Sequence, residues 1–246
     1  MTVPHIVQLK NQAALVTGGA GGLGAALCSQ LAERGARVMI ADLNENAAQA
    51  LAQQLANDGL QAEALGCDIS DTDQAEHAVR HTIDRFGAID ILINNAGIDV
   101  TCSLSELEIH DWERVLKTNL HGPFVLARAA ARHMMGRGCG QVVNITSTAA
   151  KRQWPNAVAY HASKTGLLAL SHALHAELRP AGIKVMAVIA GGMRTPFLLD
   201  RFPAIDRGTL QDPASVALAI CDLLQLPAGT VVPEVAILPT HETSWP

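Results

Sequence analysis

The sequence predicts an α/β protein built on one doubly wound parallel sheet of about seven strands. Short apolar runs alternate with longer segments of helical periodicity along nearly the whole chain. Runs such as IDILI are continuously apolar, which is typical of strands buried on both faces. Strands separated by helices of this length need right-handed crossover connections, which stack helices on both faces of a parallel sheet. These observations favour the doubly wound class.

The elements are expected in a regular order along the chain. The strand-like runs are AALVTG, RVMIAD, QAEALGCD, IDILINNAG, QVVNITS, IKVMAVIAG and EVAILP. Helical periodicity is found over residues 23–34, 45–57, 73–86, 111–135, 158–178 and 213–224, whereas residues 193–210 are expected to be irregular. Because no repeat, linker or low-complexity segment suggests a boundary, residues 1–246 are expected to form one domain.

Composition and charge indicate which kind of molecule the protein binds. Of the 246 residues, 49% are hydrophobic and 17% are charged, the balance of a packed globular protein. The net charge of −5 is spread along the chain, so neither nucleic acid nor an anionic membrane is expected as a partner. No window approaches the ~18 apolar residues of a membrane helix, and the N-terminus lacks a signal-peptide pattern. Five scattered cysteines without metal-ligand spacing indicate thiols in a reducing cytoplasm. A small-molecule partner and no metal are therefore expected.

A glycine-rich segment, TGGAGGLG at residues 17–24, follows the first predicted strand and opens the first helix. A helix N-terminus can bind a pyrophosphate if side chains do not block its approach. Two glycine registers fit: GxGxxG through Gly19, Gly21 and Gly24, and TGxxxGxG through Gly18, Gly22 and Gly24. The segment alone does not choose between them.

Asp42 ends the second predicted strand, 42 − 24 = 18 residues after Gly24. This is near the ~20-residue distance at which a carboxylate meets the adenosine ribose of a dinucleotide. The same carboxylate would repel a 2′-phosphate, and no arginine stands in the glycine loop or just after Asp42. The sequence therefore favours NAD over NADP.

Tyr160 and Lys164 are four positions apart in a stretch of helical periodicity, so their side chains share one helix face. A free tyrosine has a pKa of ~10, which an adjacent ammonium and a positive nicotinamide ring would lower. Tyr160 could then act as a base on an alcohol and as an acid on a ketone. A tyrosine and a lysine at this spacing are common on helix surfaces, so the spacing indicates a catalytic pair only when other motifs accompany it.

Five elements occur together and in order: TGxxxGxG at 17–24, NNAG at 94–97, Asn119 in NLHG, Ser147, and the pair Tyr160 and Lys164. With them the chain resembles the short-chain dehydrogenase/reductase family, in its smaller single-domain form, over nearly its whole length. The resemblance selects the register through Gly18, Gly22 and Gly24. It implies a Rossmann fold, hydride exchange between a nicotinamide and a secondary alcohol or ketone, and a homotetramer formed through the helices that begin near Asp111 and Val158.

The resemblance also implies roles for single residues. Ser147 would hydrogen-bond the substrate oxygen, Tyr160 would pass the proton, and Lys164 would bind the nicotinamide ribose and lower the pKa of the tyrosine. Asn119 would hold a water that relays the proton outward. Asp68 and Ile69 would contact the adenine, and Asn95 and Gly97 would form the turn under its ribose. The cofactor contacts implied are Thr17, Gly18, Gly22, Leu23, Gly24, Asp42, Asp68, Ile69, Asn95, Gly97, Tyr160, Lys164, Gly191 and Thr195, the last of these at the nicotinamide carboxamide.

Two segments depart from the family pattern. Ala190 and Gly191 stand where many members have Pro-Gly after the sixth strand, which leaves the order of this loop open. The C-terminal segment EVAILPTHETSWP lacks the glycine-rich ending of many members. It has three alternative fates: a cover over the substrate pocket, a contact with a neighbouring subunit, and a disordered tail.

Substrate contacts are expected from the loop before Tyr160 and from the irregular stretch after Gly192. The candidates are Gln153, Trp154, Met193, Phe197 and Leu198, which suit a medium-sized hydrophobic or mixed alcohol. Trp154 fits core packing equally well, and the ten histidines, His161 among them, are interpreted as structural or solvated. Two alternative functions stay open: an epimerase or dehydratase that retains its NAD, and a non-catalytic dinucleotide sensor. The first usually has an added C-terminal domain, and the second would not need Ser147, Tyr160 and Lys164 together.

Overall fold

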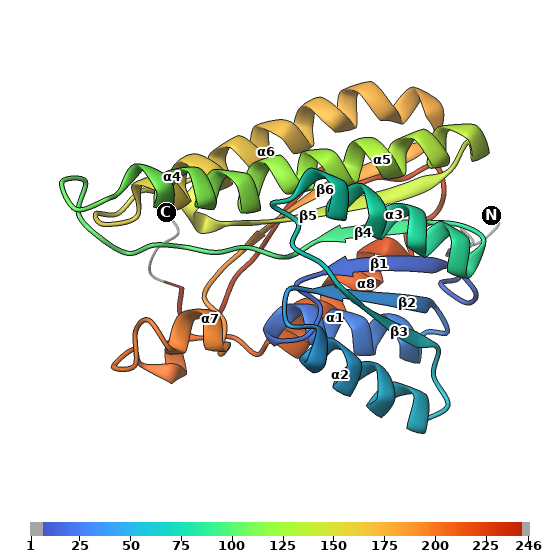
Figure 1. The fold of residues 1–246 in the computed structure, drawn as a ribbon, viewed down its shortest axis with the longest axis horizontal. Helices are drawn as coiled ribbons and strands as arrows, with labels where there is room; N and C mark the ends of the chain where they lie inside the picture. The colour runs from blue at the N-terminus through green and yellow to red at the C-terminus, as the bar shows by residue number, and fades with distance from the viewer. Residues whose placement is uncertain (1–6, 243–246) are drawn as a thin grey trace.

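Seven parallel strands form the centre of the molecule (Figure 1). The computed structural model describes residues 7–242. In the order in which they pair across the sheet, the strands are β3 (Ala62–Gly66), β2 (Arg37–Asp42), β1 (Ala13–Thr17), β4 (Ile91–Asn94), β5 (Gly140–Ser147), β6 (Ile183–Ala190) and β7 (Glu234–Ile237). Every neighbouring pair is parallel. The predicted doubly wound sheet is confirmed.

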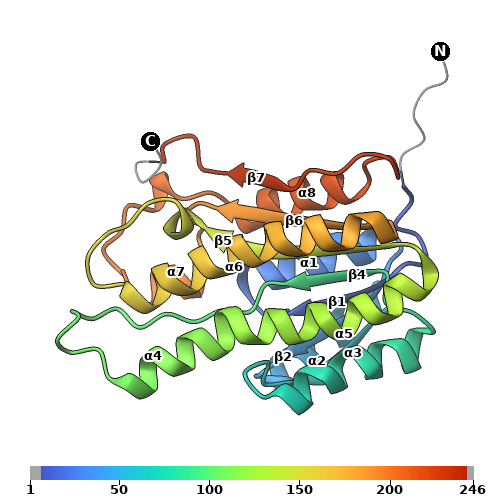
Figure 2. The same ribbon diagram turned by 90° about the horizontal axis from the view of Figure 1, so that it is seen from above.

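Helices cover both faces of this sheet, as Figures 1 and 2 show. One layer holds α1 (Gly22–Glu33), α2 (Glu45–Asn57) and α8 (Pro213–Leu224), and the other holds α3 (Thr72–Phe86), α5 (Gly122–Arg137) and α6 (Val158–Leu178). The chain winds outward from β1 to β3, returns to β4 beside β1, and then winds outward the other way. The carboxyl ends of β1 and β4 therefore flank the switch point, where crevices open in folds of this kind.

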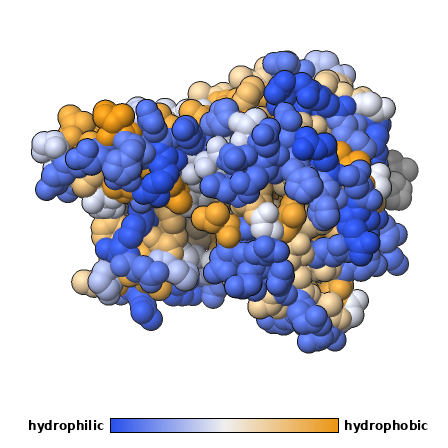
Figure 3. Space-filling model, viewed as in Figure 1, coloured by the Kyte–Doolittle hydropathy of each residue, from blue (hydrophilic) through white to orange (hydrophobic). Residues whose placement is uncertain are grey.

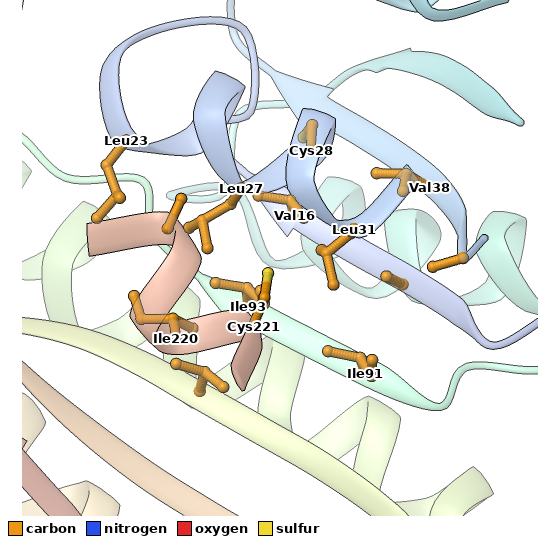
Figure 4. Close-up of a cluster of buried hydrophobic side chains, with 14 of the residues drawn as sticks. Val16, Leu23, Leu27, Cys28, Leu31, Val38, Ile91, Ile93, Ile220 and Cys221 are labelled. Atoms are coloured by element: carbon orange, nitrogen blue, oxygen red, sulfur yellow. The ribbon is translucent and has the colours of Figure 1, made fainter. Parts of the chain in front are cut away.

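An apolar cluster between the sheet and α1 fixes the position of the glycine-rich loop. Leu27 and Leu31 of α1 pack with Ile220 of α8 and with Val16 and Ile93 of the central strands (Figure 4). All five side chains are fully buried, and burying each contributes about 1.5–3 kcal/mol relative to exposure. Strands β1 and β4 are buried over their whole length, and they are apolar up to their last residues, Thr17 and Asn94.

Two expectations about the helices are corrected. The helical stretch predicted over residues 111–135 is present, but it contains a π-helical turn, Lys117–His121, that joins α4 (Ile109–Leu116) to α5. Apolar periodicity cannot show a turn in which one extra residue is accommodated within a continuing helix. The stretch expected to be irregular contains the short helix α7 (Pro196–Leu199) and the 3-10 turn Arg207–Thr209, both too short to give a periodic pattern.

Within residues 7–242, no helix is long and apolar enough to cross a membrane. All five cysteines are free thiols, and Cys28, Cys67 and Cys221 are buried. The same part of the chain holds no cluster of His, Cys, Asp or Glu side chains suited to a metal ion.

Candidate active site

A cavity of about 740 Å³ opens at the carboxyl ends of the strands, between the glycine-rich loop, the loop after β4 and the α7 segment. In Figure 3 the surface is hollowed between the part that carries α4 and the part that carries α7, and apolar residues line the hollow. Most of the predicted site residues line this cavity: Gly18, Gly22, Leu23, Asp42, Asn95, Gly97, Ser147, Trp154, Tyr160, Lys164, Gly191, Met193, Thr195, Phe197 and Leu198. The topology thus brings together residues from both halves of the chain.

The remaining predicted residues do not line the cavity: Thr17, Gly24, Asp68, Ile69, Asn119 and Gln153. Asp68 accepts a hydrogen bond from the backbone of Ser70 (2.9 Å), and Ile69 is buried with its carbonyl oxygen against Gly122. Gln153 is exposed on the loop before α6. Thr17 and Gly24 belong to the glycine loop itself, and Asn119 lies behind the cavity wall.

The glycine loop needs glycine at the positions of the TGxxxGxG register. Gly18 and Gly22 have φ of +60° and +53°, which L side chains rarely adopt. A Cβ on Gly24 would lie 1.9 Å from the carbonyl oxygen of Gly18. Gly19 also lacks room, since a Cβ there would lie 2.9 Å from a side chain of β2, but a Cβ on Gly21 would meet nothing within 4 Å. The geometry therefore agrees with Gly18, Gly22 and Gly24 rather than with a register that requires Gly21.

The NNAG turn holds the glycine loop from below. The Asn95 side-chain amide donates to the carbonyl oxygens of Thr17 (3.0 Å) and Gly18 (2.9 Å). The Thr17 hydroxyl accepts in return from the backbone N–H of Asn95 (3.2 Å). Since these bonds use both hydrogens of the Asn95 amide, its side chain positions the loop.

Asp42, the last residue of β2, lies at the edge of the cavity. One carboxylate oxygen accepts from the backbone N–H of Ala20 (2.9 Å) in the glycine loop, and the other accepts from that of Asn44 (2.9 Å). The carboxylate is therefore held in place by two backbone donors. Two cationic side chains, Lys164 and Arg201, line the described part of the cavity wall. Both lie near Tyr160 rather than near Asp42.

Tyr160, Lys164 and Ser147 converge on one wall of the cavity. Tyr160 and Lys164 project from the same face of α6 and are 9% and 4% exposed. The Lys164 ammonium donates to the carbonyl oxygen of Ile145 (2.9 Å) and lies 5.7 Å from the centre of the Tyr160 ring. Ser147, at the end of β5, lies close enough to Tyr160 for its hydroxyl to lower the pKa of the phenol, and it accepts from the backbone N–H of Ala149 (3.1 Å). Strand β5 and helix α6 thus present a hydroxyl, a phenol and an ammonium at one point.

Burial is the largest influence on the pKa values of Tyr160 and Lys164. It raises the pKa of Tyr160 to about 12, against the opposing effect of the Ser147 hydroxyl. Burial also lowers the pKa of Lys164 to about 8. The chain by itself therefore does not produce the lowered tyrosine pKa that the sequence suggested, and a positive charge from another group would be needed.

Asn119 connects the loop after β4 to α6. Its amide nitrogen donates to the carbonyl oxygen of Ile98 (2.8 Å) and to the hydroxyl of Ser163 (3.0 Å), and its amide oxygen accepts from the N–H of Ile98 (2.8 Å). Ser163 in turn donates to the carbonyl oxygen of Tyr160 (2.8 Å). The π-helical turn thus places Asn119 against the backbone of the tyrosine.

The C-terminal segment reaches the cavity, where His241 and Glu242 line the wall. A Cβ on Gly191 would lie 2.7 Å from Cδ of Pro239 and 2.8 Å from a carboxylate oxygen of Glu242. Gly191 also donates its N–H to the carbonyl oxygen of Ile237 in β7 (3.0 Å), which joins this loop to the last strand. The described part of EVAILPTHETSWP therefore lies at the pocket, in agreement with the first of the three alternatives, and residues 243–246 lie outside the described residues.

Sequence reasoning missed two charged residues of the site. Asp99 and Arg201 line the cavity and form an ion pair with each other. They are 102 positions apart, and neither belongs to a local pattern, so no signal in the sequence pointed to them. His161, interpreted as structural, is buried and contacts the carbonyl oxygen of Ala149 (2.9 Å) and the backbone of Trp154 (3.1 Å).

Known proteins are similar to this chain in both sequence and fold. A family model described as short chain dehydrogenase matches residues 12–205. D-threitol dehydrogenase of Mycolicibacterium smegmatis is 38% identical over 188 residues, which are 76% of this chain and 72% of that protein. Subunit BbsD of (2S)-[(R)-hydroxy(phenyl)methyl]succinyl-CoA dehydrogenase from Thauera aromatica is 33% identical over 87% of this chain and 90% of its own.

The structural similarity extends over almost the full length. A metagenomic short-chain oxidoreductase, solved in complex with NADP, superposes with a TM-score of 0.84 at 28% identity, over 95% of this chain and 99% of its own. The matching segment contains the glycine loop, NNAG, Ser147, Tyr160 and Lys164. The chain therefore belongs to the short-chain dehydrogenase/reductase family of oxidoreductases.

Proposed function

We propose that this protein transfers a hydride between NAD and a secondary alcohol or its ketone, with Tyr160 as general acid and base. The observation that carries the proposal is that Ser147, Tyr160 and Lys164 lie together on the wall of one cavity, which continues to the glycine loop. A substrate oxygen bound between the two hydroxyls would contact both a hydrogen-bond donor and a proton-transfer group.

The residues present fit a nicotinamide dinucleotide. Glycine at positions 18, 22 and 24 leaves the N-terminus of α1 open, where backbone N–H groups can bind a pyrophosphate. Asp42 is held at the cavity edge, where its carboxylate can accept from ribose hydroxyls. Thr195 lies against Gly22, so the segment that would hold the carboxamide adjoins the pyrophosphate loop. When bound, NAD supplies the hydride acceptor for alcohol oxidation, and its reduced form supplies the donor for ketone reduction.

The protein's own residues perform the proton chemistry. In oxidation, Ser147 donates a hydrogen bond to the alcohol oxygen while the Tyr160 phenolate takes the hydroxyl proton. In reduction, the neutral Tyr160 returns that proton to the carbonyl oxygen. Lys164 holds a positive charge near the phenolate and binds the nicotinamide ribose, and Asn119 positions the backbone of Tyr160 through Ser163. The buried position of Tyr160 and Lys164 keeps bulk water away from these transfers.

The preference for NAD over NADP rests on Asp42. Its carboxylate would repel a 2′-phosphate, and the cationic side chains of the described cavity wall surround Tyr160 rather than Asp42. The NADP complex noted above belongs to a different protein, 28% identical to this one.

The related proteins favour net hydride transfer over the two alternative functions. Those compared are named as dehydrogenases or oxidoreductases, which supports turnover rather than a retained NAD or a sensor. The names of these proteins indicate different substrates, so sequence similarity alone does not identify the substrate of this chain. We also propose a single domain, a cytoplasmic location and a homotetramer built through the helices that begin near Asp111 and Val158.

The experiment is to follow reduced-cofactor absorbance with NAD and NADP over a panel of secondary alcohols and ketones, with Tyr160→Phe as the inactive control. Turnover that depends on Tyr160 supports the proposal. A panel without turnover, although calorimetry shows that NAD is bound, would favour the sensor.

A further inference from the structure

Asp99 and Arg201 form an ion pair on the cavity wall that the proton-transfer chemistry does not use. Asp99 belongs to the loop after β4, and Arg201 follows α7. The Asp99 side chain is 6% exposed and that of Arg201 is 23% exposed. Removing a charge from water costs free energy unless the charge is well paired, so a buried carboxylate at this place needs an explanation.

The pair lies beside the tyrosine. The Arg201 guanidinium stacks 4.0 Å from the centre of the Phe197 ring, and that ring lies 6.0 Å from the ring of Tyr160. The charge of Asp99 raises the pKa of Tyr160 and that of Arg201 lowers it, so both charges act on the phenol. A group bound by this ion pair would therefore belong to the part of the substrate that extends from its reacting carbon toward Phe197.

The hydrogen bonding of the pair is incomplete. Oδ2 of Asp99 accepts from Nη1 of Arg201, but Oδ1 is buried without a partner. Nε of Arg201 donates to the carbonyl oxygen of Phe197 (2.7 Å), while Nη2 has no hydrogen bond within residues 7–242. A buried acceptor left unpaired is costly, and a ligand that supplies a donor relieves this cost. The pair thus offers one free acceptor and one free donor.

A hydroxyl matches both. It donates its hydrogen to the carboxylate and accepts from the guanidinium with its oxygen. An ammonium would suit Asp99 but would be repelled by Arg201, and a carboxylate would suit Arg201 but would be repelled by Asp99. A ketone oxygen could only accept.

We propose that the substrate is a diol, or the corresponding hydroxyketone in the reverse direction, whose second hydroxyl binds between Oδ1 of Asp99 and Nη2 of Arg201. This inference rests on the proposed oxidation of alcohols. Because Oδ1 is shielded from solvent, the hydroxyl reaches it when Arg201 moves with the segment after α7. Phe202 and Ile205 of that segment line the cavity, where they would contact the carbon chain of the diol.

The test compares matched pairs of alcohols: butane-2,3-diol with butan-2-ol, and cyclohexane-1,2-diol with cyclohexanol. A site built to hydrogen-bond a hydroxyl rejects the analogue that lacks it, so kcat/KM for the diol is expected to exceed that for the mono-alcohol by about 100-fold or more. Asp99→Ala and Arg201→Met should each lower this ratio at least about tenfold, chiefly through KM. The ratio cancels any general loss of activity.

Two matched variants serve as controls. Asp200→Ala and Arg207→Met remove exposed charges from the same segment, where neither forms an ion pair within the described residues. Both should leave the ratio unchanged. Circular dichroism establishes that each variant is folded, and Arg201→Met carries the test if Asp99→Ala does not fold.

The proposal is overturned if diol and mono-alcohol react equally well, or if folded variants at Asp99 and Arg201 keep the diol preference. Failure of the proposed function has a different signature, because then no alcohol yields reduced cofactor. In that case calorimetry with NADH present compares the Kd values of the same pairs. Tighter binding of the diols, lost in the variants, supports the diol site, and equal binding overturns it.

Discussion

Tyr160 and Lys164 lie one turn apart on α6, with the ammonium 5.7 Å from the centre of the phenol ring. Burial raises the pKa of the phenol to about 12 and lowers the pKa of the ammonium to about 8. At pH 7 the protein alone therefore has a neutral phenol beside a largely charged lysine. Tyr160 must therefore lose a tightly held proton before it can act as a base in oxidation. In reduction it already carries the proton that it donates.

Tyr160→Phe tests the acid and base role directly. Removing the hydroxyl should lower kcat about 10²–10⁴-fold, the usual contribution of a positioned acid or base. NAD binding should change little, because the ring remains in place, and fluorescence titration measures it. Retention of more than a small residue of activity would show that another group transfers the proton.

The two directions should respond differently to pH. Oxidation needs ionised Tyr160, so its kcat/KM should rise by up to about tenfold per pH unit between pH 6 and 8. It should flatten above pH 8 as Lys164, whose pKa is about 8, loses its charge. Reduction needs neutral Tyr160, whose pKa of about 12 keeps it protonated, so its rate should stay level to pH 9. Mirror-image profiles with equal slopes would contradict this assignment.

Asp42→Ala should shift the cofactor preference toward NADP. The variant removes the carboxylate that would repel a 2′-phosphate and that the backbone of Ala20 and Asn44 holds in place. The measurement is the ratio of kcat/KM for the two cofactors with one alcohol. An unchanged ratio would mean that Asp42 does not meet the adenosine ribose.

Gly24→Ala should destabilise the fold. Its Cβ would lie 1.9 Å from the carbonyl oxygen of Gly18, and relief of such a contact costs about 1–3 kcal/mol. Thermal unfolding should show Tm lowered by about 2–12 °C, given ~2–4 °C per kcal/mol for a chain of this size. Gly136→Ala in α5 is the matched control, since a Cβ there meets nothing within 4 Å, and it should gain about 0.5–1 kcal/mol.

Phe124→Glu tests the proposed tetramer. Phe124 is 42% exposed on α5, and Val158 is 40% exposed at the start of α6, so both present apolar surface along the proposed interface. Light scattering should show a tetramer for the native chain and a smaller species for the variant. Gln53→Glu on α2, on the other face of the sheet, should not change the mass. A monomeric mass for the native chain would contradict the proposed tetramer.

The strands and most helices could be predicted because burial on both faces leaves continuous apolar runs, and turns at the strand ends are marked by Gly, Asn and Asp. The π-helical turn at Lys117–His121 could not, since its five residues carry no composition of their own. The short α7 has no period to detect. Both lie where the chain departs from ideal geometry beside the site.

The site divides in the same way. Ser147, Tyr160 and Lys164 belong to local motifs, and the topology brings them together. Asp99 and Arg201 meet only because the loop after β4 and the α7 segment fold over one cavity, which no short-range pattern records. The pKa of Tyr160 also depends on burial by distant segments, so its direction could not be read from the four-residue spacing.

The π-helical turn has a consequence for the length of the chain. In a π-helix each backbone bond spans five residues instead of four, so one additional residue is inserted into an otherwise α-helical rod. One residue corresponds to a rotation of about 100° around an α-helix. Deleting a single residue from Lys117–His121 would therefore turn all of α4 relative to α5 and carry Asn119 away from Ile98 and Ser163. In this segment the number of residues is constrained as tightly as their identity.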